Sequence, residues 1–264
     1  MGLAYREAGA SDAPVALCLH GYPNSSYLFK DVLPALADAG YRAIAPDFPG
    51  FGDSPPLLGR EGTWADHISA LDDFVAEHDL APAALVVHDW GGLIGLRWAC
   101  DRPYVASALV IMGTGFFADG RWHGLAQGLR TPGQGEQISA SITRATFGEL
   151  LRGASRRITE RALDEYWKAF VDDERRRTHL ALYRSGEFGE LAAYEGRLAA
   201  LGVPTLLLWG EQDPFAPVAS AHRLHREIPG SELVILPDAG HFLMEDEPER
   251  VASEIALFLR AVRA

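Results

Sequence analysis

The sequence is poor in cysteine and in positive charge, and it lacks long hydrophobic runs. Its 264 residues include two cysteines, 24 lysines and arginines, and 36 aspartates and glutamates, so the formal net charge is −12. Such a field repels phosphate backbones and anionic membrane surfaces, which argues against nucleic acid and membranes as partners. No apolar stretch reaches the roughly 20 residues of a membrane span, and no basic segment followed by an apolar one opens the chain.

The two cysteines, Cys18 and Cys100, lie in a strand-like and a helix-like segment. Because they are only two and show no metal-binding spacing, we interpret them as small buried hydrophobic side chains rather than disulfide partners or metal ligands. The composition therefore predicts a soluble, cytoplasmic globular protein, which we expect to be a monomer or a homodimer.

Short apolar runs alternate with longer amphipathic segments along most of the chain. The runs that we interpret as buried strands are 15–20, 42–46, 84–88, 107–112, 203–209 and 232–236. Among the segments between them, 64–78 is preceded by Thr63, with Asp66 three residues later in capping-box spacing. Alternating strands and helices predict a mostly parallel sheet flanked by helices, with functional groups at the carboxyl ends of its strands.

One stretch interrupts this alternation. From about residue 116 to residue 201 the pattern is wholly helical, and the apolar run at 203–209 then resumes the sheet. We predict that residues 1–115 and 202–264 form an α/β core domain, and that residues 116–201 form a helical cap inserted in it. An insertion at this point would lie over the strand ends and act as a lid over a pocket.

The segment with the clearest chemistry reads Val87-His88-Asp89-Trp90-Gly91-Gly92. A strand runs into one acidic residue, and small residues and an apolar helix follow. The glycines allow a turn too sharp for larger residues, which pushes Asp89 into the open beside a helix N-terminus. That geometry is the nucleophile elbow, in which serine normally takes the central position. The alternative is an aspartate that only caps the helix.

Two further residues follow predicted strands in an informative order. Asp213 comes just after the strand at 203–209, and His241 comes just after the strand at 232–236. A single histidine at a strand end is more often structural. Nucleophile, acid and histidine in this chain order nevertheless match a hydrolytic triad, with Asp89 as nucleophile, Asp213 as orienting acid and His241 as base.

A fourth element, Leu19-His20-Gly21-Tyr22-Pro23, follows the first predicted strand. Gly21 allows the backbone to turn, so that the Tyr22 amide can point at a developing negative oxygen. Together with the Trp90 amide it would form an oxyanion hole. Taken alone, the segment is equally compatible with an ordinary glycine-proline turn.

These segments, with residues 45–54, resemble the α/β-hydrolase superfamily, and specifically its branch of haloalkane dehalogenases and epoxide hydrolases with an aspartate nucleophile. The resemblance covers nearly the whole chain outside the insertion and implies the α/β-hydrolase fold with a helical cap. It also implies a two-step reaction without metal or cofactor. Asp89 would displace a halide or open an epoxide and form an alkyl-enzyme ester. Water activated by His241, which Asp213 orients, would then hydrolyse that ester.

Within this branch, the resemblance leans towards halide over epoxide. Trp90 matches the halide-binding tryptophan of dehalogenases, and an indole N–H can only donate. Trp122 lies in a segment similar to the first cap helix of haloacetate dehalogenases, where a tryptophan binds halide. Tyr183 instead matches a cap tyrosine that serves as the acid in epoxide hydrolases, and Tyr22 stands where many dehalogenases have a halide-binding asparagine. Those haloacetate enzymes carry an arginine where this chain has Trp90, so a haloacid substrate is not expected.

We therefore expect Trp90, Trp122 and Tyr183 to form a pocket for the leaving group or substrate, although simple lid packing would explain Trp122 and Tyr183 equally well. The substrate would be a small apolar organic molecule, with water as the second reactant. Hydrolytic dehalogenation ranks first, and epoxide hydrolysis to vicinal diols with Tyr183 as acid ranks second. A non-catalytic ligand-binding protein on the same fold is the third alternative, and it would require a misplaced triad.

Overall fold

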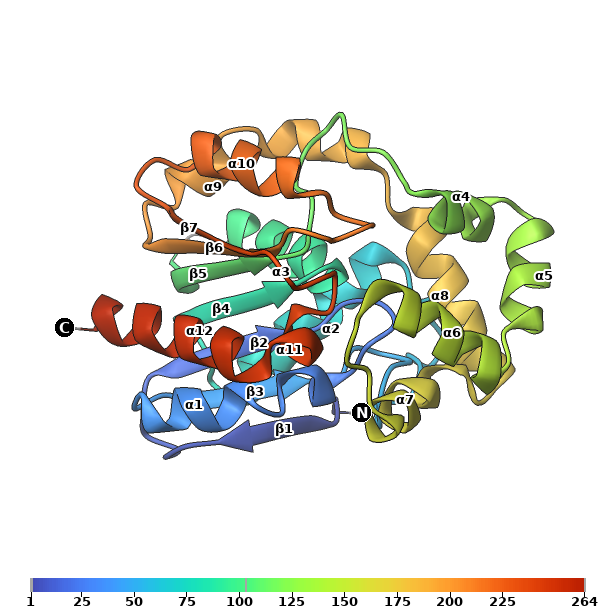
Figure 1. The fold of residues 1–264 in the computed structure, drawn as a ribbon, viewed down its shortest axis with the longest axis horizontal. Helices are drawn as coiled ribbons and strands as arrows, with labels where there is room; N and C mark the ends of the chain where they lie inside the picture. The colour runs from blue at the N-terminus through green and yellow to red at the C-terminus, as the bar shows by residue number, and fades with distance from the viewer. Residues whose placement is uncertain (1, 103, 264) are drawn as a thin grey trace.

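The computed structural model describes residues 2–102 and 104–263, and a seven-stranded sheet forms its centre (Figure 1). The strand order is β1-β3-β2-β4-β5-β6-β7, with β1 antiparallel to β3 and every other neighbouring pair parallel. The carboxyl ends of β2 to β7 therefore meet at one edge of the sheet. The strands are β1 (Tyr5–Ala8), β2 (Val15–Leu19), β3 (Arg42–Pro46), β4 (Ala83–His88), β5 (Ala106–Met112), β6 (Thr205–Gly210) and β7 (Glu232–Leu236).

Helices cover both faces of this sheet. On one face, in front in Figure 1, α1 (Val32–Asp38) packs against α12 (Pro248–Val262). On the opposite face, α2 (Trp64–Glu77) packs against α3 (Trp90–Asp101). Because both faces are covered, β4 and β6 are buried along their whole length, which explains their continuous apolar sequences. The remaining core elements are η1 (Ser26–Phe29), α10 (Val218–Glu227) and α11 (Leu243–Asp246).

The six strands predicted from the sequence are all present, each within two residues of its predicted limits. The helix predicted after Thr63 is also confirmed, and its capping box is formed. The Thr63 hydroxyl accepts a hydrogen bond from the Asp66 amide at 3.2 Å, and the Asp66 carboxylate accepts one from the Thr63 amide at 3.0 Å. β1 is missing from the prediction because this edge strand is polar and half exposed, so it carries no buried apolar run.

Between β5 and β6, the described chain contains helices and no strand, as the sequence predicts. Figure 1 shows α4 to α8 beyond the carboxyl ends of the parallel strands, where they cover that edge of the sheet. The elements are α4 (Gly124–Arg130), α5 (Gln134–Ser141), α6 (Arg144–Ala154), α7 (Glu160–Trp167), η2 (Lys168–Phe170), α8 (Asp173–Ser185), η3 (Phe188–Tyr194) and α9 (Arg197–Ala200). In the described part of the chain, no helix has both the length and the hydropathy to cross a membrane.

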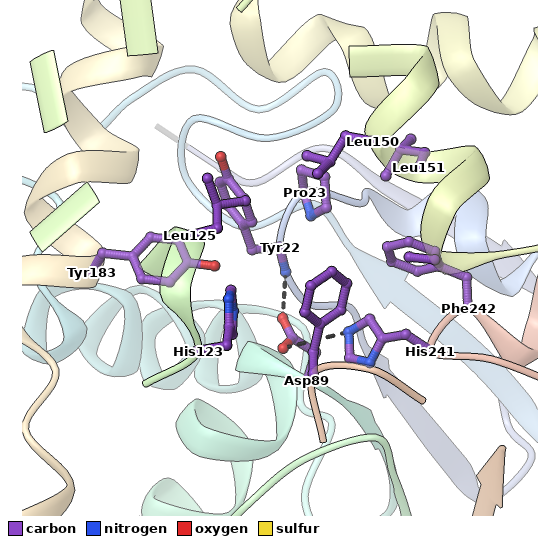
Figure 2. Close-up of a pocket in the computed structure, with 12 residues that line it drawn as sticks. Tyr22, Pro23, Asp89, His123, Leu125, Leu150, Leu151, Tyr183, His241 and Phe242 are labelled. Carbon is purple, nitrogen blue, oxygen red and sulfur yellow. Dashed lines mark hydrogen bonds and ion pairs between the residues drawn. The ribbon is translucent and has the colours of Figure 1, made fainter. Parts of the chain in front are cut away.

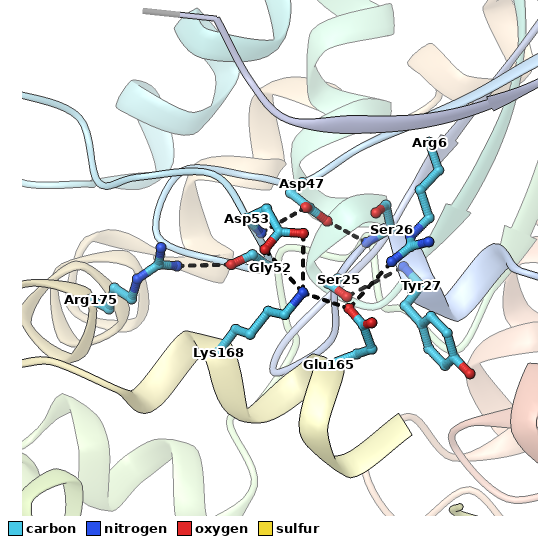
Figure 3. Close-up of polar contacts among 10 residues, drawn as sticks. All are labelled: Arg6, Ser25, Ser26, Tyr27, Asp47, Gly52, Asp53, Glu165, Lys168 and Arg175. Carbon is cyan, nitrogen blue, oxygen red and sulfur yellow. Dashed lines mark hydrogen bonds and ion pairs between the residues drawn. The ribbon is translucent and has the colours of Figure 1, made fainter. Parts of the chain in front are cut away.

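Ion pairs and hydrogen bonds join this helical segment to the core on the side shown in Figure 3. Lys168 lies 3.0 Å from Asp53 and 2.8 Å from Glu165, and Glu165 also contacts Arg6 at 3.3 Å. The Arg175 guanidinium donates to the Gly52 carbonyl at 3.1 Å. The 47–53 loop, which these groups contact, is itself held by Asp47, since its carboxylate accepts from the Asp53 amide at 2.9 Å.

Three buried histidines lie close to the edge of the sheet where the parallel strands have their carboxyl ends. Burial lowers the pKa of His67 and of His179 to about 3, and that of His88 to about 4. These imidazoles are therefore neutral in the folded protein at neutral pH. Neither ring nitrogen of His67 has a hydrogen-bond partner among the described residues, and the ring packs edge-on against Phe48.

We predict that the protein loses stability as the pH falls below about 6.5, the ordinary pKa of histidine. Below that pH the unfolded chain binds protons that the folded protein excludes at these histidines, so the free energy of unfolding decreases. His67→Leu should flatten this dependence by up to about 1.4 kcal/mol per pH unit between about pH 4 and 6. Urea unfolding at a series of pH values measures the slope. A change in packing at position 67 would lower the free energy of unfolding by the same amount at every pH and leave the slope unchanged. An unchanged slope would therefore contradict the prediction.

Candidate active site

The candidate nucleophile lies in the sharp turn between β4 and α3. Asp89 has φ 51° and ψ −121°, a backbone conformation that residues other than glycine seldom adopt. The Thr114 hydroxyl holds this turn by donating to the Asp89 carbonyl at 2.8 Å. Gly91 passes so close to β2 that a Cβ atom there would lie 2.1 Å from the Leu19 carbonyl oxygen. Asp89 makes no capping hydrogen bond to α3, so its carboxylate points elsewhere.

The carboxylate of Asp89 faces His241, as Figure 2 shows. His241 Nε2 lies 3.6 Å from an Asp89 oxygen, and His241 Nδ1 lies 2.8 Å from an Asp213 oxygen. The second Asp213 oxygen accepts from the amides of Phe215 and Ala216 at 2.8 and 2.9 Å. These amides fix the carboxylate, so that its free oxygen is aimed at the imidazole. The three residues predicted from the sequence therefore lie together, just beyond the ends of β4, β6 and β7.

The backbone of His241 is held from two directions. The buried His88 side chain donates from Nε2 to the His241 carbonyl at 2.9 Å, and its ring lies 4.7 Å from the His241 ring. The His241 amide donates to the carbonyl of Ala154, at the end of α6, at 3.2 Å. Core and insertion therefore both contribute to the position of this imidazole.

The Tyr22 amide donates to the Asp89 carboxylate at 2.7 Å. Gly21 makes this approach possible, because a Cβ atom at that position would lie 2.3 Å from the same carboxylate oxygen. The Trp90 amide, at the start of α3, helps to lower the pKa of the carboxylate. Of the two amides expected to form an oxyanion hole, the Tyr22 amide thus binds the candidate nucleophile itself.

The charges of Asp89, His241 and Asp213 stabilise one another. Burial alone would raise the pKa of Asp89, but the adjacent His241, with smaller contributions from His88 and the Trp90 amide, brings it below its ordinary value. Burial would likewise lower the pKa of His241, but Asp213 and then Asp89 outweigh it and raise that pKa to about 10. At neutral pH an imidazolium therefore lies between two carboxylates.

A cavity of about 30 Å³ opens above Asp89. Since a water molecule needs roughly 10–15 Å³ of such space, the cavity as it stands holds about two waters. Its lining is mostly apolar and contains no lysine or arginine. The lining residues are Tyr22, Pro23, Asp89, His123, Leu125, Leu150, Leu151, Ala154, Tyr183, Phe215, His241 and Phe242.

Of the three residues expected in a leaving-group pocket, only Tyr183 lines this cavity. The indole of Trp122 instead stacks on that of Trp90, with ring centroids 5.4 Å apart and planes inclined by 22°. The Trp122 Nε1 atom is buried and has no partner among the described residues. Trp90 and Trp122 are therefore packed on each other, and neither is among the residues that line this cavity.

Several lining residues are absent from the sequence-based expectation. Leu125, Leu150 and Leu151 belong to α4 and α6, and Phe215 follows Asp213 in the loop after β6. Apolar residues in amphipathic helices give no sign of which neighbour they will contact. Among these unpredicted lining residues, His123 was the one that the sequence could have indicated, because it directly follows Trp122. In the structure it is the N-cap residue of α4. Among the residues described, no group of three or more histidines, cysteines, aspartates or glutamates is placed to hold a metal ion.

Comparison with known proteins agrees with this geometry. Residues 14–248 match the family described as alpha/beta hydrolase fold. A haloalkane dehalogenase of Bradyrhizobium diazoefficiens is 30% identical, with 99% of this chain and 92% of that protein covered. A second, from Psychrobacter cryohalolentis, is also 30% identical, with 97% and 86% covered.

Among solved structures, a loop variant of the haloalkane dehalogenase DbeA from Bradyrhizobium elkanii superposes with a TM-score of 0.86 at 29% identity. That superposition covers 99% of this chain and 93% of the DbeA chain. The chain therefore belongs to the α/β-hydrolase fold family, in the branch that contains the haloalkane dehalogenases.

Proposed function

We propose that this protein hydrolyses carbon–halogen bonds in small, uncharged haloalkanes, with Asp89 as nucleophile, His241 as base and Asp213 as orienting acid. The observation that carries the proposal is an ionised aspartate at the elbow, facing a histidine inside a small apolar cavity. A carboxylate is a competent nucleophile at saturated carbon when it is ionised and shielded from water. The dehalogenase relatives support the same reaction.

In the first step, one oxygen of Asp89 attacks the carbon that bears the halogen. The Tyr22 amide holds the other oxygen at 2.7 Å and orients the carboxylate. A bond forms between carbon and oxygen while the carbon–halogen bond breaks, and the bonding electron pair leaves with the halide. The product is a neutral ester of Asp89.

In the second step, ester formation removes one of the two negative charges that hold the pKa of His241 high. The imidazole can then release its proton to solvent and accept one from a water molecule, whose oxygen attacks the ester carbonyl carbon. The negative charge develops on the Asp89 oxygen that the Tyr22 amide already holds. As this intermediate collapses, the proton of its new hydroxyl group passes to the departing alkoxide oxygen, which gives the alcohol and the Asp89 carboxylate, and the proton taken from water stays on His241.

We also propose that residues 1–115 and 202–264 work as a core domain and residues 116–201 as its cap. The core would supply Asp89, Asp213 and His241, and the cap would supply Tyr183 and the leucines that close the cavity. A cytoplasmic location, a monomeric or homodimeric state and the exclusion of nucleic acid stay predictions from composition.

Epoxide hydrolysis is a second candidate, favoured by one observation. Tyr183 lines the same cavity, and burial holds its pKa well above the ordinary value for tyrosine. Such a phenol keeps its proton until a strongly basic alkoxide forms beside it. A non-catalytic role would require a misplaced triad. His241 instead lies 2.8 Å from Asp213 and 3.6 Å from Asp89, which does not support that role.

We predict that Asp89→Asn lowers steady-state bromide release from 1-bromopropane by roughly 10⁴-fold or more, because a neutral amide is a poor nucleophile. Asp73→Asn, on an exposed part of α2, removes the same charge elsewhere and serves as the control. Thermal unfolding verifies that both variants fold. Undiminished multiple turnover by Asp89→Asn would refute the mechanism.

Dehalogenation and epoxide opening give different products, so the two candidates can be separated directly. We expect the wild-type protein to release bromide from 1-bromopropane and to form no propane-1,2-diol from 1,2-epoxypropane. An ion-selective electrode and gas chromatography measure the two products. Diol without bromide would reverse the ranking, and Tyr183→Phe should then abolish diol formation because the alkoxide loses its acid.

We predict that the pKa of His241 depends on the charge of Asp89. In the wild-type protein the imidazole should titrate near pH 10, and in Asp89→Asn it should titrate at lower pH, because one adjacent carboxylate is gone. Chemical shifts of the ring carbons, followed against pH by NMR, give both values. An equal or higher pKa in Asp89→Asn would show that the two groups are not electrostatically paired.

A further inference from the structure

Asp246 is a buried acidic residue to which the reaction described above gives no part. It is the last residue of α11, the short helix that follows His241, and only 2% of its surface is exposed. One carboxylate oxygen accepts hydrogen bonds from the Ser155 hydroxyl and the Arg156 amide, both at 2.6 Å. The other oxygen accepts from the Gly240 amide at 2.8 Å. A single side chain thus joins the residue before His241 to the segment that follows α6.

The main-chain amides of Gly240 and His241 are both linked to the end of α6. The Gly240 amide is linked to it through Asp246, and the His241 amide donates directly to the Ala154 carbonyl at 3.2 Å. The two segments approach closely, because a Cβ atom at position 240 would lie 2.6 Å from that carbonyl oxygen. The His241 carbonyl accepts instead from His88, in the core. Two hydrogen bonds therefore tie this main chain to the end of α6, and Asp246 accepts one of them.

The end of α6 is also part of the cavity wall. Leu150, Leu151 and Ala154 line the cavity, and Figure 2 shows both leucines on the side where His241 lies. The last turn of α6 therefore faces the space for the substrate and, through Asp246, also holds the His241 main chain.

Glu245, which precedes Asp246 in α11, makes a different link to the helical segment. It is also buried, and its carboxylate accepts from the Tyr166 hydroxyl of α7 at 2.6 Å and lies 3.0 Å from Lys30 Nζ. Within the described chain, this carboxylate accepts no hydrogen bond from residues 239–241. Glu245 therefore contacts the helical segment without holding the His241 main chain, and it offers a matched comparison.

We propose that Asp246 is a positioning residue that sets the place of the His241 imidazole by coupling its main chain to the end of α6. The inference rests on the proposed dehalogenation. A base must lie within hydrogen-bond reach of the proton that it removes, and a misplacement of about 1 Å can slow a reaction by roughly 10²-fold. Only the second step uses His241 as a base. A displaced imidazole therefore slows ester hydrolysis much more than the attack of Asp89 on carbon.

Asp246→Asn keeps the shape of the side chain but leaves it one acceptor oxygen. Its amide nitrogen must face either the Gly240 amide or the donors of Ser155 and Arg156, so one of the two links is lost. We expect this variant to release a first bromide from 1-bromopropane about as fast as the wild type, and to complete later turnovers roughly 10-fold more slowly. Rapid-quench measurement of bromide gives both rates. Mass spectrometry of the intact protein detects the propyl ester that accumulates on Asp89.

Two further variants test the link to α6 and the loss of charge. Ser155→Ala removes one of the three hydrogen bonds to Asp246, so it should slow later turnovers in the same way but by less, and it decides the question alone if Asp246→Asn does not fold. Glu245→Gln removes a neighbouring buried negative charge. It should unfold at a lower temperature but keep the wild-type ratio of first to later turnovers.

If Asp246 only stabilises the fold, part of the variant protein is inactive. The amount of bromide released in the first turnover and the later rate then fall in proportion, and no ester accumulates. That result overturns the inference and leaves the proposed function standing, as does equal ester accumulation in Glu245→Gln, because loss of a buried charge would then suffice. Absence of bromide release by the wild-type protein overturns the proposed function and this inference with it.

Discussion

The interaction on which the site depends is an imidazolium buried between two carboxylates. His241 contacts Asp213 at 2.8 Å and Asp89 at 3.6 Å, and burial makes each of these charges costly without the others. Hydrogen bonds that involve the main chain hold the three residues in this arrangement. Amides of Phe215 and Ala216 hold Asp213, the Tyr22 amide holds Asp89, and carbonyl and amide contacts hold the His241 main chain. The proposed chemistry follows from removing one of the two negative charges.

Parallel topology is what brings these groups together. The three residues are far apart in the chain, but each follows a strand whose carboxyl end lies at the same edge of the sheet. The elbow adds a local requirement, since Asp89 adopts a strained backbone and Gly91 must pass against β2. Helices of the insertion then cover the edge, and α6 contributes directly by accepting a hydrogen bond from the His241 amide at the Ala154 carbonyl.

Much of this could be predicted from the sequence, because the decisive signals are local. Buried strands show as apolar runs, and the elbow shows as an acidic residue followed by Gly91 and Gly92. What escaped prediction depends on packing between distant segments. Edge strand β1 has no buried run, the turning of Trp122 onto Trp90 depends on how the insertion docks, and the lining leucines resemble any apolar helix face. The contacts of Asp246 follow only once the end of α6 is known to lie beside α11.

An aspartate nucleophile and a lining without lysine or arginine are consistent with each other. A lysine or arginine beside Asp89 would bind a departing anion well, but before the reaction it would neutralise the carboxylate that has to attack. The positive charge near Asp89 is instead that of His241, whose pKa depends on Asp89 itself and falls once the ester forms in the proposed mechanism. Most other side chains that line the cavity are apolar, so they add no second cation beside Asp89. A lining without lysine or arginine also offers no partner to a negatively charged substrate group, which is consistent with the uncharged haloalkanes of the proposed function.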